Sequence, residues 1–106
     1  MLGTNNLSQP SVSVVIPVFN DSARLQKCLL ALENQSYPSS LYEVLVIDND
    51  STEDIKRVVD CFTKTKIFLE TAVGSYAARN KGIEVAKGDL IAFTDADCIP
   101  AKQWIE

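Results

Sequence analysis

The sequence predicts an α/β domain with a doubly wound, mostly parallel four-stranded sheet that carries helices on both faces. Two observations support this fold class. Four short apolar segments alternate with three amphipathic segments, and each connection is long enough for a right-handed crossover between parallel strands. This order of elements is typical of a parallel sheet covered on both sides, and 106 residues suffice for one such domain but not for two.

The first strand and helix are the most regular part of the pattern. Residues 12–16 (VSVVI) are apolar and rich in β-branched side chains, as in a strand buried on both faces, and Pro17 ends this run. Residues 20–22 (NDS) can each cap the helix that follows, and residues 36–38 (SYP) stop it. The apolar side chains of this helix recur at i, i+3, i+4 and i+7, and they are Leu25, Cys28, Leu29 and Leu32.

A second strand and helix follow the same logic. Residues 42–47 (YEVLVI) predict a second buried strand, and residues 48–51 (DNDS) form the turn that leaves it. Ser51 and Asp54 resemble a capping box at the start of a helix. The apolar stripe of that helix consists of Ile55, Val58, Val59 and Phe62. Residues 66–70 predict a short third strand.

The third helix is expected from about residue 75 to residue 87, with Gly88 as a left-handed cap. Its small side chains allow close packing against the sheet, and they are those of Ala77, Ala78, Gly82, Val85 and Ala86. Residues 90–93 (LIAF) predict the fourth strand, which leads directly into residues 94–97 (TDAD). Residues 1–10 are expected to form a flexible arm, so that the domain itself spans residues 11–106.

Composition narrows the functional classes. The net charge of −4 argues against non-specific nucleic-acid binding, which needs a basic face. The chain contains no histidine, which excludes histidine-based triads, zinc sites and general bases within it. Three widely spaced cysteines favour a reducing compartment, and neither a signal peptide nor a membrane span is visible. We therefore expect a cytoplasmic protein, with the cytoplasmic face of a membrane as a further possible location of the complete protein.

Polar residues follow three of the predicted strands, and the carboxyl ends of parallel strands share one edge of a sheet. We therefore expect residues 17–20 (PVFN), 48–50 (DND) and 95–97 (DAD) to meet there. Asp95 and Asp97 offer two hard oxygen ligands, which suit Mg²⁺ or Mn²⁺ bound to phosphate oxygens, and we favour this role over a simple capped turn. For Asp48 and Asp50 a ligand-binding role and a turn role remain equally open.

Three segments together resemble the amino-terminal part of family-2 glycosyltransferases, which have a GT-A fold: VSVVIPVFND, YEVLVIDNDST and AARNKGIEVAKGDLIAFTDADC. The resemblance implies a Rossmann-like front half of that fold, which binds a nucleotide sugar. It implies that Pro17, Val18 and Phe19 lie along the nucleobase. It also implies that the turn at Asp48 and Asn49 forms hydrogen bonds to uracil or another base.

The same resemblance implies roles for the later residues. Arg79 approaches the base or the diphosphate, although from the residues alone a solvated surface position is favoured for this side chain. Asp95 faces the ribose or the metal, Ala96 lies at the nucleotide, and Asp97 coordinates Mn²⁺ or Mg²⁺ on the diphosphate. This chain carries Asn49 where many members carry a second aspartate, so an amide replaces the carboxylate that reads the base.

The resemblance predicts a glycosyltransferase that moves a sugar from a nucleoside diphosphate, with UDP favoured, to an acceptor hydroxyl with inversion. The acceptor is expected to be a saccharide or a lipid-linked molecule. No catalytic base is expected within this chain, because the acceptor half of the family follows the segment that ends at Glu106. The chain alone is therefore expected to be inactive, and an exposed sheet edge would permit self-association.

Three alternatives remain beside this hypothesis. One is a non-catalytic nucleotide-binding or assembly module, which this length also permits. A phosphoacceptor receiver domain also gathers aspartates around Mg²⁺, but its first strand would end in an acidic pair rather than in residues 17–20 (PVFN). A haloacid-type phosphatase shares the Asp-x-Asp pattern, but it would require threonine or valine at the position of Ile99.

Overall fold

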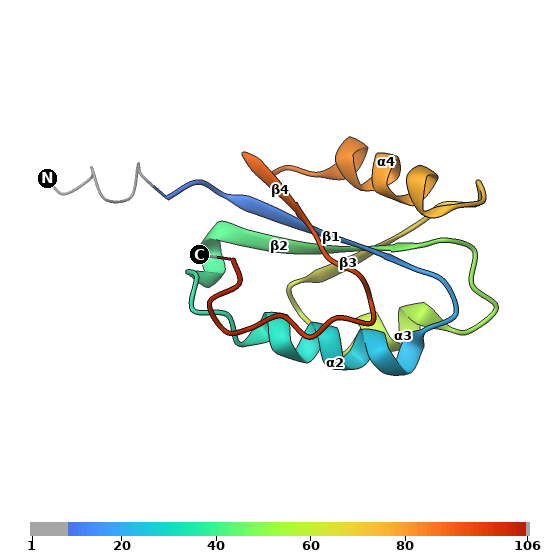
Figure 1. Ribbon diagram of the computed structural model, residues 1–106, viewed down its shortest axis with the longest axis horizontal. Coiled ribbons are helices and arrows are strands. Elements are labelled where there is room, and N and C mark those ends of the chain that lie inside the picture. Colours follow the sequence, from blue (N-terminus) through green and yellow to red (C-terminus); the bar gives the residue numbers. More distant parts are fainter. Residues whose placement is uncertain (1–8, 106) are drawn as a thin grey trace, which may run out of the picture.

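A computed structural model describes residues 9–105, with four parallel strands at their centre (Figure 1). The strands lie in the order β3-β2-β1-β4. Their bounds are β1 Val12–Val18, β2 Tyr42–Asp48, β3 Thr65–Leu69 and β4 Leu90–Phe93. The helices are α2 Ser22–Glu33, α3 Ile55–Val59 and α4 Ser75–Val85, with a 3-10 turn η1 at Ser39–Leu41. The predicted fold class is confirmed; residues 1–8 of the predicted arm lie outside the described residues.

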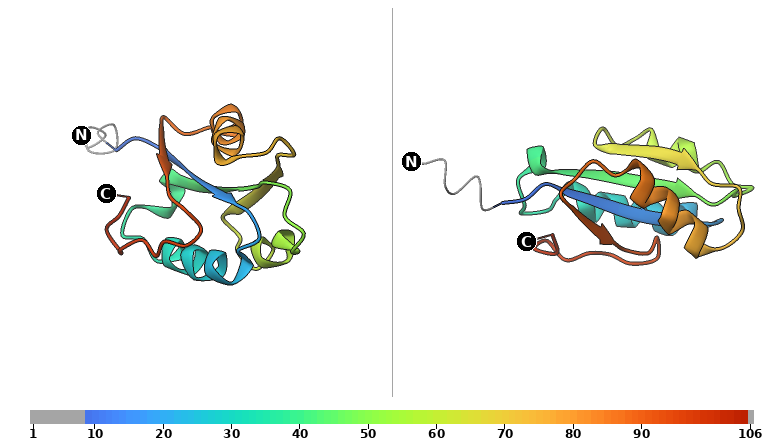
Figure 2. Two further views of the ribbon diagram at one scale, coloured as in Figure 1. Left: turned by 45° about the vertical axis from the view of Figure 1, so that its right-hand side comes forward. Right: turned by 90° about the horizontal axis from the view of Figure 1, so that it is seen from above.

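The helices cover both faces of the sheet, with α4 on one side and α2 and α3 on the other (Figures 1 and 2). On the α2 side, the four apolar residues of the predicted stripe are all buried, from Leu25 to Leu32. On the other side, small residues bring α4 close to β1. A Cβ atom added at Gly82 would lie 2.3 Å from Cγ1 of Val15, so this position admits no larger side chain without movement.

Strand β1 continues through Pro17, two residues further than the sequence predicts. It pairs with β4 only as far as Val15, which lies opposite Phe93, whereas its pairing with β2 runs to Val18. Val15 and Val18 accept bonds on opposite sides of β1, from Thr94 and Asn49 respectively, so the nitrogen of Pro17 is on the unpaired β4 side. Its missing N–H therefore costs no bond of the sheet.

Two predicted caps are wrong. The cap of α3 is Asp54 itself, which accepts a bond from the Arg57 amide at 3.2 Å, and Ser51 donates its amide to Asp48 instead. Among the glycines that the structure describes, Gly74 has a positive φ and Gly88 does not. Gly88 is required for a different reason, because an added Cβ atom there would lie 2.7 Å from the Ser13 amide nitrogen.

After β4 the chain turns back and runs along α2 to the described end (Figures 1 and 2). Gln35 holds this return segment, because its Nε2 donates to the Ala101 carbonyl at 2.8 Å and its Oε1 accepts from the Ile105 amide at 3.0 Å. Strand β4 itself is an edge, and Leu90 and Phe93 remain 54% and 42% exposed. In the described part of the chain, no helix has both the length and the apolar character needed to cross a membrane.

Candidate functional site

Hydrogen bonds join the loops that leave β1 and β2 at the carboxyl edge of the sheet. Asn20 has a positive φ of 49°, a conformation that asparagine tolerates better than most residues. Its Oδ1 accepts bonds from the Thr52 amide at 2.9 Å and the Glu53 amide at 3.2 Å. The backbone amide of Asn20 donates a hydrogen bond to Ser51 Oγ at 2.9 Å. The end of β1 is therefore fixed relative to the turn that follows β2.

Asn49 joins the next pair of loops, those that leave β2 and β3. Its Nδ2 donates to the carbonyl of Glu70 at 3.0 Å and to that of Ala72 at 2.8 Å. Its backbone amide donates to the Val18 carbonyl at 2.8 Å, which continues the pairing of β2 with β1. One residue thus connects the ends of three adjacent strands.

These loops enclose a cavity of about 500 Å³, which is within the usual range for small-molecule sites. The lining residues are Pro17, Val18, Phe19, Asn49, Asp50, Thr71, Val73, Gly74 and Asp95. Phe19 and Val73 are exposed apolar side chains on its wall, with 61% and 99% of their surface accessible. The cavity therefore combines apolar surface, suited to a flat ring, with a few polar groups that can orient it.

The structure brings five of the predicted nucleotide-binding residues to this cavity, namely Pro17, Val18, Phe19, Asn49 and Asp95. Three others do not line it. The Asp48 side chain is bonded within the turn after β2, where its Oδ1 accepts a hydrogen bond from the Ser51 amide at 2.9 Å. Arg79 is exposed on α4, and Ala96 is buried in the hydrophobic core.

Sequence reasoning did not include Thr71, Val73 and Gly74, which reach the cavity from the loop after β3. The rule that polar segments collect at the carboxyl ends of parallel strands applies to this loop as well. Residues 71–74 (TAVG) contain no acidic or aromatic side chain, so the sequence gives no signal that they belong to the site. Gly74 combines a φ of 109° with a ψ of 150°, a region that is essentially restricted to glycine.

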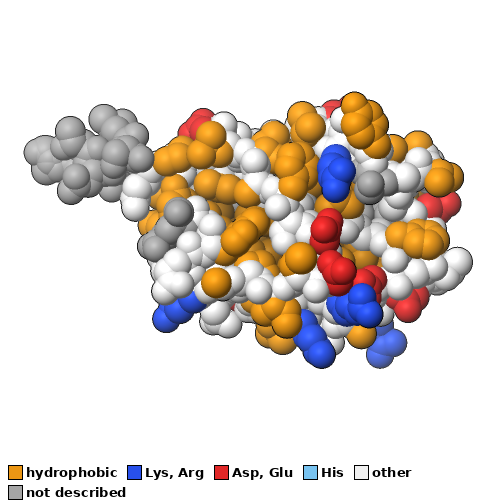
Figure 3. Space-filling view, in the orientation of Figure 1, with side chains coloured by type: hydrophobic (Ala, Val, Ile, Leu, Met, Phe, Trp, Pro, Cys, Tyr) orange, Lys and Arg blue, Asp and Glu red, His pale blue; other side chains and the backbone are white. Residues whose placement is uncertain are grey.

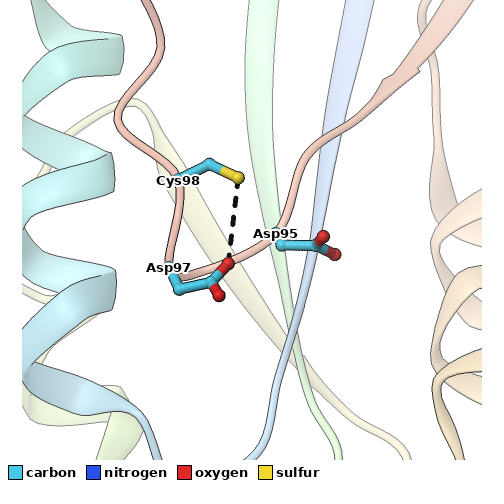
Figure 4. Close-up of side chains that lie close together, drawn as sticks. All are labelled: Asp95, Asp97 and Cys98. Carbon is cyan, nitrogen blue, oxygen red and sulfur yellow. Dashed lines mark hydrogen bonds between the residues drawn. The ribbon is translucent and has the colours of Figure 1, made fainter.

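A second cluster adjoins the cavity. The ligand atoms of Asp95, Asp97 and Cys98 lie within 4.8 Å of one another, on the segment that leaves β4 (Figure 4). Acidic side chains gather near the middle of this face of the molecule, with basic side chains above and below them (Figure 3). Two exposed carboxylates at this spacing fit a hard divalent cation, and Cys98 adds a softer sulfur donor that the sequence prediction did not include.

Cys28 supports this cluster from below. Its side chain is fully buried on α2, and its thiol donates to the Asp95 carbonyl at 3.8 Å. Burial, reinforced by the nearby Cys98 thiol and the carboxylates of Asp95 and Asp97, raises the pKa of Cys28 to about 12. The thiol is therefore protonated at neutral pH, and it serves as packing rather than as a nucleophile.

Comparison with known proteins identifies the family. The sequence profile of the family described as Glycosyl transferase family 2 matches residues 13–106, nearly the whole chain. The chain belongs to this family. Membership favours the glycosyltransferase hypothesis over the receiver-domain and phosphatase alternatives.

Relatives of the family 2 chain agree with this assignment. The chain is 48% identical over 102 residues to the glycosyltransferase AglE of Haloferax volcanii, and the match covers 92% of this chain and 34% of AglE. It resembles the mannosyltransferase PcManGT of Pyrobaculum calidifontis in complex with GDP-Man and Mn²⁺, with a TM-score of 0.82, 28% identity, and coverage of 89% and 30%. It also resembles S. aureus TarS in complex with UDP, with a TM-score of 0.84, 25% identity, and coverage of 90% and 30%. The chain thus spans about a third of the length of these relatives.

Proposed function

We propose that this chain forms the nucleotide-sugar-binding part of an inverting, metal-dependent glycosyltransferase. One observation carries the proposal: Asp95 belongs both to the cavity wall and to the cluster with Asp97 and Cys98. A nucleoside in the cavity would have its diphosphate beside a cation held by that cluster. The complexes of two structurally similar proteins, PcManGT with GDP-Man and Mn²⁺ and TarS with UDP, support a ligand of this class.

The acidic surroundings explain why a cation would be needed. A diphosphate placed beside Asp95 and Asp97 would meet like charges, and the repulsion would oppose binding. A bound Mn²⁺ or Mg²⁺ would supply positive charge to the diphosphate as it leaves the sugar. Asp97 would hold this ion, while Asp95 would share it or face the ribose. Arg79 would approach the diphosphate or the base by a rotation of its exposed side chain on α4.

The acceptor site and the catalytic base lie, in this proposal, in a part of the protein that follows residues 11–106. The chain covers 34% of AglE, and its β4 edge exposes apolar side chains such as Leu90 and Phe93, which a further segment would cover. The acceptor would be a saccharide or a lipid-linked molecule. The free thiols of Cys28, Cys61 and Cys98 support the cytoplasm, a reducing compartment, as the place of reaction.

Calorimetric titration with UDP and GDP, with and without Mn²⁺, tests this proposal. We expect binding that depends on the metal, and a loss of affinity of at least about tenfold for Asp97→Asn, because a charged ligand is removed. Asp89→Asn is the matched control, since Asp89 is an exposed aspartate that precedes β4 at the opposite edge of the sheet. A folded chain that binds neither nucleotide at millimolar concentration would refute the proposal. Inversion is tested separately, from the anomeric configuration of the product formed by the complete protein.

A further inference from the structure

The turn that follows β4 is anchored in the core and presents three donor side chains to solvent. The Cys98 amide donates to the Asp95 carbonyl at 3.0 Å, which closes the turn. Ala96 lies between them, is only 6% exposed and packs in the hydrophobic core. The side chains of Asp95, Asp97 and Cys98 are all exposed. An anchored turn thus holds two carboxylates and a thiol together at the surface.

The spacing of these donors fits a single cation. Metal–ligand bonds of about 2.0 to 2.3 Å place two ligands of one ion about 3 to 4.5 Å apart. Cys98 Sγ lies 3.8 Å from Asp97 Oδ1, which is inside that range, and the dashed line in Figure 4 joins the two groups. The ligand atoms of all three residues lie within 4.8 Å of one another, so a small side-chain rotation would bring Asp95 to the same ion.

The charge of the cluster is not offset by the surrounding protein. None of the ion pairs found among the described residues includes Asp95 or Asp97. Neighbouring carboxylates repel each other, and a bound cation removes that repulsion. Cys98 is exposed, whereas Cys28 is fully buried as a packing residue. The Cys98 sulfur is therefore accessible to an ion that the carboxylates attract.

We propose that Cys98 is a ligand of the cation at this site, and that its sulfur makes the site prefer borderline ions such as Zn²⁺ over Mg²⁺. The inference rests on the proposed function, because it concerns the cation that would neutralise the donor diphosphate. Carboxylate oxygens alone suit Mg²⁺ and Mn²⁺, whereas thiolate sulfur suits Zn²⁺ and Cd²⁺. When such an ion binds, the sulfur–metal bond replaces the S–H bond of Cys98, and the proton passes to the solvent.

The mixed donor set gives different ions different numbers of protein ligands. Mg²⁺ would use the oxygens of Asp95 and Asp97 and leave Cys98 as a neutral thiol. Zn²⁺ would use the sulfur as well, and the additional bond would raise its affinity. Cys98 is thus a residue that determines which ion the site selects, while the two carboxylates supply most of its charge.

Cadmium tests the sulfur bond directly, because a bond between Cd²⁺ and a thiolate gives a charge-transfer absorption band in the ultraviolet. The titration uses the variant Cys61→Ser, which removes the other exposed thiol while Cys28 stays buried. We expect the band to grow with added Cd²⁺ and to saturate at a single ion per chain. Adding Cys98→Ser should abolish the band. A Cys61→Ser chain that shows no band would overturn the inference.

Calorimetric titration with Zn²⁺ alone and with Mg²⁺ alone tests the selectivity. We expect Cys98→Ser to lower the ratio of Zn²⁺ to Mg²⁺ affinity by at least about tenfold, mainly through weaker Zn²⁺ binding. Cys61→Ser is the matched control, since it removes an exposed thiol outside the cluster and should preserve the ratio. An unchanged ratio in Cys98→Ser would contradict the role of the sulfur.

The outcomes separate this inference from the proposed function. If UDP or GDP binding requires a divalent ion and Cd²⁺ produces no thiolate band, oxygen ligands alone hold the ion, so the inference fails while the proposed function stands. If the band appears but a folded chain binds neither nucleotide, the proposed function fails while the sulfur ligand stands. Circular dichroism of each variant verifies that it folds.

Discussion

Replacement of Asn20 by alanine should destabilise the protein by about 2 to 3 kcal/mol. Three hydrogen bonds to Oδ1 are lost, from the Thr52 amide, the Thr52 hydroxyl at 3.1 Å and the Glu53 amide. Because the site is exposed, each is worth only about 0.5 kcal/mol. Alanine must also adopt the left-handed backbone at φ 49°, which adds about 1 kcal/mol.

Urea unfolding at neutral pH measures this effect, and two further variants at position 20 separate its causes. Asn20→Asp retains the acceptor and a tolerance for positive φ, so its free energy of unfolding should stay close to that of the unaltered chain. Asn20→Gly loses the bonds but not the backbone tolerance, and it should fall between the other two. Nucleotide affinity should decrease in the order Asn20→Asp, Asn20→Gly, Asn20→Ala. If the free energy of unfolding of Asn20→Ala lies within about 0.5 kcal/mol of that of the unaltered chain, the contacts of Asn20 do not hold the two loops together.

Three further changes test the packing and the ionisation of the domain. Gly82→Ala should lower the free energy of unfolding by about 1 to 2 kcal/mol, because the clash with Val15 outweighs the better helix propensity of alanine. The control Asn80→Ala, on exposed surface of the same helix, should be neutral or slightly stabilising. A Gly82→Ala variant more stable than the unaltered chain would contradict the close packing of α4 on β1. Gly74→Ala should cost about 1 to 3 kcal/mol although nothing lies within 4 Å of the added Cβ atom, since its φ of 109° and ψ of 150° strain any other residue, so an unchanged melting temperature would disprove this reason. The pKa of Cys28 rises from 9.0 to about 12 on folding. The contribution of the protonated thiol to the free energy of unfolding is therefore fully present below pH 9, and up to about 4 kcal/mol of it should be lost as the pH rises toward 12. Cys28→Val should show a shallower decline in chemical unfolding over that range, and identical slopes would exclude the thiol as the cause.

Local patterns predicted the elements of this domain well because burial imposes them directly. The helical stripe from Leu25 to Leu32 is buried throughout, and β1 and β2 are buried as their β-branched sequences require. One of the two wrong caps fell where a distant contact decides the local structure. The sequence predicts Gly88 as a helix cap, whereas its close approach to Ser13 on β1 accounts for the glycine. That contact is invisible in a window of neighbouring residues.

The sequence by itself determined the family, the parallel sheet and the edge where a ligand would bind, because apolar periodicity and the position of polar residues after strands are local properties. Only the tertiary structure decided which of these residues share a cavity. It separated Asn49, on the wall, from Asp48, which is bonded within the turn. It also fixed the direction of the Asn49 amide, since that depends on two carbonyl groups that lie 21 and 23 residues further along the chain. Hydrogen-bond direction is a property of neighbours in space, and no sequence pattern around Asn49 specifies it.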